Sequence, residues 1–182
     1  DVDGITSTVL LLETLRRYTE RADCTIPVIE DGYGLNRDYL DTAKRDGIGL
    51  IITVDCGIGN VDEIEYARQL GIDVIVTDHH EPPAVLPKAV ALIDPKLPRT
   101  VYPHKDMAGV GVSLKLALAL ELADRRGERG HRGLDVGRRA VDHGQLDLRL
   151  RTALGAGRVA LAALALAAQR HRAAALLLAF LD

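Results

Sequence analysis

Three short stretches of the sequence combine residue types that bind metal ions. They are Asp1-Val2-Asp3-Gly4, Val54-Asp55-Cys56-Gly57 and Thr77-Asp78-His79-His80. The second and third directly follow apolar runs typical of buried strands, and open α/β sheets bind their ligands at the carboxyl ends of strands. Imidazole together with carboxylate suits Mn, Zn or Fe better than Ca. The sequence therefore predicts a metal centre assembled from several strand ends.

The spacing of these residues fits a two-metal hydrolase, which needs a carboxylate that can bridge ions ~3.5–4 Å apart and terminal ligands for each ion. Asp1 and Asp3 lie two residues apart, so both side chains would project to one side of an extended segment. Asp55 would end a neighbouring strand, which is a natural place for the bridging carboxylate. His79 could supply a neutral imidazole.

Each stretch also has an ordinary structural interpretation. Asp1 and Asp3 could cap a following helix. Asp55 could open a turn, and Asp78 with the two histidines could be solvated polar surface. Because all three stretches are expected at strand ends of one sheet, each beside Gly or Pro, the metal site is favoured.

Strand-like and helix-like segments alternate along the first two thirds of the chain. Short β-branched apolar runs predict strands over 24–29, 50–55, 74–77 and 89–93. Apolar residues at helical spacing predict helices over 5–18, 37–46, 61–70 and 109–126. This alternation indicates an α/β fold, a parallel β-sheet flanked by helices.

The composition changes after about residue 122. The last lysine is Lys115, and arginine, alanine and leucine dominate beyond it. We therefore divide the chain into a catalytic core over 1–122 and an Ala/Leu/Arg-rich segment over 123–182. The alternation of Ala and Leu over 150–181 favours helix on propensity alone, so this C-terminal segment is expected to be helical.

The composition of this 182-residue chain excludes several classes of protein. A net charge of −3 offers no global basicity for nucleic acid, so an anionic substrate would need a local or metal site. Cys24 and Cys56 form no CxxC motif and favour a reducing compartment. No signal peptide and no run of ~18 apolar residues is present, so we expect a cytoplasmic protein with no membrane contact. The chain starts inside a motif, and we expect the strand leading into Asp1 to be missing.

Three stretches resemble motifs I, II and III of the DHH phosphoesterase superfamily. They are residues 1–7 (DVDGITS), 54–58 (VDCGI) and 76–81 (VTDHHE). Two more, residues 31–36 (DGYGLN) and 108–116 (AGVGVSLKL), are similar to the RecJ-like exonucleases of that superfamily. The resemblance extends from Asp1 to about Leu122, and the motifs agree in order and spacing.

This resemblance implies a phosphodiesterase that depends on two manganese or magnesium ions. The RecJ-like members hydrolyse single-stranded DNA from 5′ to 3′ in DNA repair and recombination, so single-stranded DNA is the implied substrate. Asp1 and Asp3 match carboxylates that bind separate metals, Asp55 matches the bridging carboxylate and His79 a metal ligand. With Asp55 and His79, His80 completes the implied catalytic set, and Asp78 matches a residue that supports the ligands.

The remaining candidates rest on weaker patterns. The superfamily's motif IV aspartate lies roughly 60 residues after the histidine pair, where Asp142 is the candidate although its surroundings do not match. Asp94 also ends an expected strand, but the family pattern makes that segment structural. Tyr33 could stack on a base or simply occupy a turn. Lys115 could approach phosphate or belong to a solvated helix face.

Two other functions stay open. The chain could be a different DHH-family phosphoesterase that acts on oligonucleotides, cyclic dinucleotides or pyrophosphate. It could also be a non-catalytic domain that uses the DHH fold to bind protein or nucleic acid. The RecJ-like glycine-rich stretches argue against the first, and the intact motif I, II and III ligands argue against the second.

Overall fold

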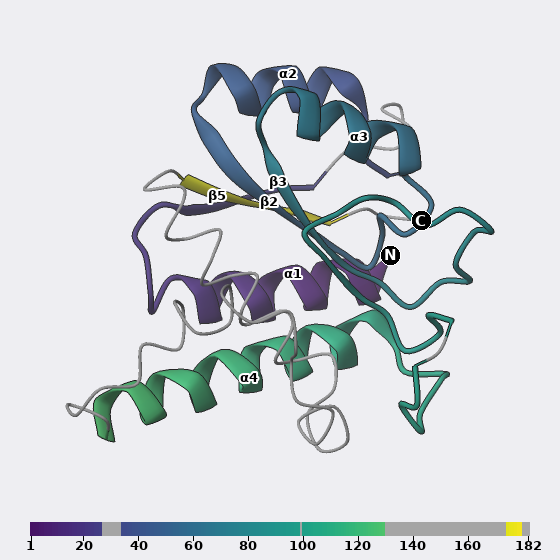
Figure 1. Ribbon diagram of the computed structural model, residues 1–182. Coiled ribbons are helices and arrows are strands. Elements are labelled where there is room, and N and C mark those ends of the chain that lie inside the picture. The colour runs from purple at the N-terminus through teal and green to yellow at the C-terminus, as the bar shows by residue number, and fades with distance from the viewer. Residues whose placement is uncertain (27–33, 99, 130–173, 180–182) are drawn as a thin grey trace, which may run out of the picture.

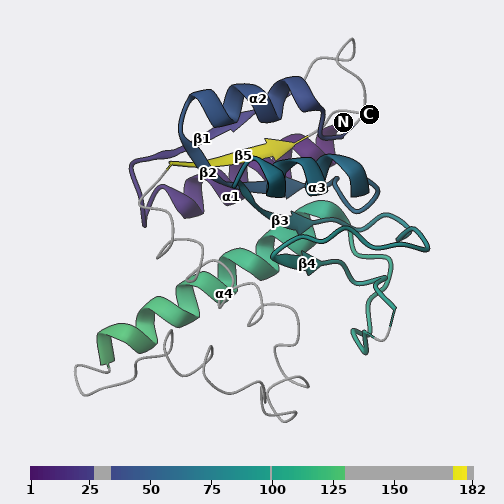
Figure 2. The same ribbon diagram turned by 45° about the horizontal axis from the view of Figure 1, so that its top comes forward.

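The computed structural model describes residues 1–26, 34–98, 100–129 and 174–179, which form a parallel β-sheet covered by helices on both faces (Figure 1). The strands are β1 (Ala22–Thr25), β2 (Ile48–Val54), β3 (Asp73–Thr77), β4 (Ala91–Ile93) and β5 (Ala174–Ala179). They are arranged in the order β1-β5-β2-β3-β4, and every neighbouring pair is parallel (Figure 2). The predicted α/β fold class is confirmed.

Two helices cover each face of the sheet (Figure 1). The four helices are α1 (Val2–Leu15), α2 (Arg37–Arg45), α3 (Val61–Gln69) and α4 (Gly109–Arg129). Helices α1 and α4 pack with β2, β3 and β4 in one apolar cluster, and α2 and α3 form the cluster on the opposite face. None of the helices among the described residues is long and apolar enough to span a bilayer.

The central strands contribute alternate residues to these two clusters. Leu50, Ile52 and Val54 of β2 point toward α1 and α4, whereas Ile51 points toward α2 and α3. A strand buried on both faces must be apolar throughout, because successive side chains project to opposite sides. The mostly apolar sequence of β2, in which the buried Thr53 hydroxyl is hydrogen-bonded, is therefore typical of a central strand.

Helix α1 begins earlier than the expected range of 5–18. Asp1 is its N-cap, and the Gly4 N–H donates to Asp1 Oδ1 at 2.8 Å. Asp1 and Asp3 therefore do not lie on an extended segment, and the expectation that both side chains share one side of a strand is wrong. The helix-cap interpretation holds for Asp1, because a capped helix satisfies the backbone N–H groups of its first turn.

The segment after residue 122 differs in part from the expected helix. Helix α4 continues through Arg129, so residues 123–129 are helical. Residues 174–179, however, form β5, and for them the helical expectation is wrong. Their Ala and Leu residues favour helix locally, but this strand pairs with both β1 and β2, and tertiary pairing overrides propensity. Residues 130–173 and 180–182 lie outside the described residues, so the helical expectation for them and the boundary near 122 stay predictions.

Candidate metal centre

The candidate site lies at the carboxyl ends of β2 and β3. These strands are paired in register, with Val54 opposite Thr77. The Asp55 N–H donates to the Thr77 carbonyl at 2.9 Å, which extends the pairing one residue past β2. Because the strands are parallel and end together, the residues that follow them meet at one edge of the sheet, as the sequence predicts.

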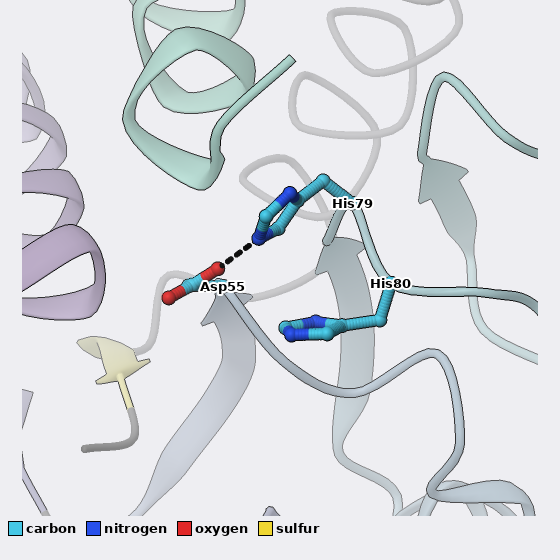
Figure 3. A group of neighbouring side chains, drawn as sticks. All are labelled: Asp55, His79 and His80. Carbon is cyan, nitrogen blue, oxygen red and sulfur yellow. Dashed lines mark ion pairs between the residues drawn. The ribbon is translucent and has the colours of Figure 1, made fainter. Parts of the chain in front are cut away.

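Asp55, His79 and His80 form a compact group at this edge (Figure 3). One potential ligand atom from each lies within 4.8 Å of the others. His79 Nε2 is 2.9 Å from Asp55 Oδ1, and the Asp55 side chain is almost fully buried. Figure 3 shows both imidazole rings extending from the end of β3 toward Asp55. A carboxylate and two imidazoles converging in this way can coordinate a transition-metal ion.

Two buried threonines hold the turn that presents Asp55. Thr53 Oγ1 donates to the Cys56 carbonyl at 2.8 Å, and Thr77 Oγ1 donates to the Thr53 carbonyl at 2.6 Å. Among the described residues, Asp55 is the one non-glycine residue in the left-handed region, with φ of 62°. Left-handed backbone is unfavourable for most residues and persists where its surroundings determine it. The hydroxyl pair provides that constraint.

Asp78 organises the histidine pair. Its Oδ1 accepts from the N–H groups of His79 (2.7 Å) and His80 (3.2 Å) and lies 2.6 Å from His80 Nδ1. Its Oδ2 accepts from the Ile58 N–H at 2.8 Å, which links β3 to the loop after β2. Asp78 is only 1% exposed, so this buried carboxylate fixes the orientation of the His80 ring.

Asp3 reaches the site from α1. Its Oδ2 lies 3.7 Å from His79 Nε2. The same carboxylate accepts from the N–H groups of Gly109 and Val110, each at 2.7 Å, at the start of α4. A negative charge at a helix N-terminus satisfies N–H groups that have no partner within the helix and interacts favourably with the helix dipole. Asp3 therefore links α1 to the start of α4 and lies beside His79 at the edge of the sheet.

Comparison with known proteins identifies the family of this arrangement. The family model described as "DHH family, N-terminal domain" matches residues 1–135. The chain belongs to the DHH family. In this DHH domain, the Asp-His-His sequence after β3 supplies two members of the candidate metal-binding group and a carboxylate that contacts one of them.

The DHH domain is similar to curated exonucleases named RecJ. It is 49% identical over 127 residues to the single-stranded-DNA-specific exonuclease RecJ of Bacillus subtilis, covering 68% of this chain and 16% of the relative. It is 48% identical over 122 residues to the protein of that name from Escherichia coli, covering 66% of this chain and 21% of the relative. The chain thus spans about a fifth or less of the length of these relatives.

Solved structures of two exonucleases have the same fold. One is exonuclease RecJ bound to manganese, with a TM-score of 0.57 and 32% identity, over 70% of this chain and 32% of that chain. The other is RecJ from Thermus thermophilus in complex with Mn²⁺, with a TM-score of 0.52 and 29% identity, over 70% of this chain and 17% of that chain. Both neighbours hold the metal that the resemblance implies.

Other predicted site residues of the DHH domain are not brought to this group. The Asp1 carboxylate caps α1, and Asp1 is not a member of the clustered set in the described structure. Lys115 is exposed on α4, nearly two turns after its first residue, which agrees with a solvated helix face. Tyr33 and Asp142 lie outside the described residues, so their predicted roles stay predictions.

Asp94 is buried close to the site although the family pattern ranks it as structural. It follows β4, which pairs with β3, and is 3% exposed. Its Oδ1 accepts from the Lys96 N–H at 2.7 Å, while Oδ2 has no hydrogen-bond partner among the described residues. Burial, supported by the nearby Asp78 charge, raises the pKa of Asp94 to about 6, although the hydrogen bond from the Lys96 N–H acts in the opposite direction. Its position at a strand end was the available sequence signal.

Proposed function

We propose that this DHH domain is the catalytic core of a metal-dependent phosphodiesterase that degrades single-stranded DNA from the 5′ end. The observation that carries the proposal is the group of Asp55, His79 and His80 where β2 and β3 end. The names of the RecJ relatives and the manganese in the two similar structures support the substrate and the metal.

The donor atoms of the site fit Mn²⁺ or Mg²⁺. Asp55 and Asp3 offer carboxylate oxygens and His79 an imidazole nitrogen, a set that suits Mn²⁺ in particular. Asp3 can accept two N–H groups and still face a cation, because each carboxylate oxygen has two lone pairs. We propose Asp55 as the bridging ligand, with His79, Asp3, Asp1 and Asp142 as the remaining ligands of two ions.

Bound ions of this kind lower the pKa of a coordinated water molecule and neutralise charge on the phosphate. The protein's own contribution is to hold the reacting groups in position. Asp55 presents its carboxylate from a constrained turn, and the Asp3 carboxylate locks α4 against the same edge. His80, oriented by Asp78 through Nδ1, would bind a phosphate oxygen or hold a proton for the leaving oxygen at Nε2.

The cellular role follows from the same proposal. An exonuclease of this type would act in DNA repair and recombination in the bacterial cytoplasm. Cys24 and Cys56 form no disulfide bond in the described part of the chain. Single-stranded DNA is the proposed partner.

A panel of substrates tests the proposed activity. The protein with Mn²⁺ would be incubated with single-stranded DNA labelled at the 5′ or 3′ end, duplex DNA, a cyclic dinucleotide and pyrophosphate. Rapid release of the 5′ label from the single strand, with slow loss of the 3′ label, is expected. Preferential hydrolysis of the cyclic dinucleotide or pyrophosphate would assign the domain to another DHH phosphoesterase. No hydrolysis and no Mn²⁺ binding would favour a non-catalytic binding domain.

A further inference from the structure

A cleft of about 430 Å³ adjoins the metal group. Residues 57–60 of the loop between β2 and α3 form one side, and Asp78, His80 and Glu81 form the other. His80 belongs both to the metal group and to the cleft wall. A substrate held at the metal group would therefore have this cleft next to its reacting phosphate. The volume falls within the range of about 300–1,000 Å³ that small-molecule sites occupy.

The charge around the cleft disfavours a second phosphate as its occupant. Its lining contains the carboxylates of Asp78 and Glu81 and no lysine or arginine. The first turn of α3 adds two further acidic residues. The nearby Lys96 is paired with Glu81, with Nζ 3.3 Å from Oε1. The negative charges of these carboxylates would repel a second phosphate, so an uncharged group with hydrogen-bonding capacity fits this cleft better.

The surface of the cleft suits a flat ring. Gly57 and Gly59 present backbone instead of side chains, and the Ile58 side chain between them is buried. The side chain of His80 is 41% exposed and offers an aromatic face. Bases of single-stranded nucleic acids stack on aromatic and histidine side chains, and this stacking tolerates any base because every base has a π-face.

The walls of the cleft are held in place before any ligand binds. The Ile58 N–H donates to Asp78, so the loop and the histidine segment are joined directly. Asn60 forms two hydrogen bonds with the backbone of Leu35, one accepted at 3.2 Å and one donated at 3.3 Å. A preformed cleft binds its ligand with less loss of conformational freedom.

We propose that this cleft binds the nucleoside next to the scissile phosphate, with its base against the His80 ring. The inference rests on the function proposed above and adds the position of one nucleoside. The proposal also gives a role to the loop of Gly57 and Gly59, which lies beside His80 and leaves room for a base next to the metal group.

Gly59 offers a direct way to block the cleft. A Cβ atom at this position would meet no heavy atom within 4 Å, and the backbone is not in the left-handed region. A side chain can therefore start at this position without a clash at its Cβ, and a phenylalanine here is chosen to fill part of the cleft that Gly59 lines. Val9→Phe is the matched control, because it introduces the same ring at an exposed position of α1 that does not line the cleft.

The test compares two single-stranded DNA substrates. The first carries bases on both nucleotides that flank the scissile phosphate, and the second has abasic residues at these two positions. We expect the wild-type protein and Val9→Phe to cleave the substrate with bases about 10-fold more efficiently, in line with the usual contribution of a stacked base. Gly59→Phe should reduce this preference to about 1. Equal cleavage of both substrates by the wild-type protein, or a full preference in Gly59→Phe, would overturn the proposal.

Binding measured without turnover separates this inference from the proposed activity. Thymidine 5′-monophosphate would be titrated into the protein with Mg²⁺, and backbone amide shifts would be followed by NMR. Shifts at residues 57–60 and His80 that 2-deoxyribose 5-phosphate does not produce are expected, even if no nuclease activity is found. The same shifts from both ligands, or none at the cleft, would contradict a nucleoside site.

Discussion

Gly109 lies directly against Asp55. A Cβ atom at position 109 would come within 2.5 Å of Asp55 Oδ1 and 2.8 Å of its Cγ, both shorter than real Cβ contacts. The Gly109 N–H also donates to Asp3. The first residue of α4 must therefore lack a side chain for the helix to reach the site and for Asp55 to keep its position.

The change Gly109→Ala should displace either Asp55 or the start of α4. We expect a loss of about 1–3 kcal/mol in the free energy of unfolding, as for overpacked sites, and at least about 10-fold weaker Mn²⁺ binding. Thermal unfolding and calorimetric titration would measure both. Gly59→Ala is the control, because a Cβ atom there would meet no heavy atom within 4 Å. Wild-type Mn²⁺ affinity in Gly109→Ala would contradict this account.

The Thr53 hydroxyl should position Asp55 through the turn. Thr53→Val keeps the shape but removes the donor to the Cys56 carbonyl, so we expect a loss of about 1 kcal/mol in stability. Because the turn then constrains Asp55 less, kcat should fall more than KM rises. Thr53→Ser retains the donor and should restore most of the activity. Equal kinetics of the valine and serine variants would argue against a positioning role.

The Asp78 carboxylate should act through His80. Asp78→Asn replaces a carboxylate that contacts His80 Nδ1 and accepts from three backbone N–H groups, so these contacts become weaker. Supporting contacts of this kind typically change activity by about 10–100-fold. Steady-state kinetics of Asp78→Asn, His80→Ala and the double variant would measure the coupling between the effects of the two residues on activity. Because one residue acts through the other, the two effects should be strongly non-additive. Simple additivity would contradict this relation.

Asp94 should make the folded state less stable as the pH rises. Its folded pKa of about 6 lies above the usual value of 3.8, so the folded state retains a proton that the unfolded state releases. The contribution of protonated Asp94 to the free energy of unfolding is therefore fully present below about pH 4. This contribution, roughly 1–3 kcal/mol, is lost as the pH rises toward and through about 6. Asp94→Asn should remove this slope. Urea unfolding of both proteins between pH 4 and 8, with a chelator present, is the measurement. If the free energy of unfolding depends on pH in the same way in Asp94→Asn as in the wild type, the assignment of this dependence to Asp94 is refuted.

The sequence predicts those residues of the site that directly follow a strand. Asp55 and the Asp78–His80 segment follow apolar runs, and parallel pairing in register brings them together. Contacts between distant segments are less predictable. The sequence pattern of Gly109 does not reveal that it meets Asp55, because the angle at which α4 approaches the sheet decides this contact.

Local signals also misled at two places. The Asp1 and Asp3 spacing is compatible with an extended segment, but the capping bond to Gly4 favours a helix from Val2 onward. Residues 174–179 have helical propensity and nevertheless form a strand, because the backbones of β1 and β2 pair with them. In both cases the deciding hydrogen bonds are visible only in the folded structure.

The most direct test of the central claim is release of nucleotides from 5′-labelled single-stranded DNA over a series of Mn²⁺ concentrations. The wild-type protein, Asp55→Asn and Glu13→Gln would be compared, since Glu13 is exposed on α1. We expect activity that saturates with Mn²⁺ in the wild type and Glu13→Gln, and a loss of at least about 100-fold in Asp55→Asn, which removes the charge of the proposed bridging ligand. Undiminished Mn²⁺-dependent activity in Asp55→Asn would contradict a metal centre built on Asp55 and His79.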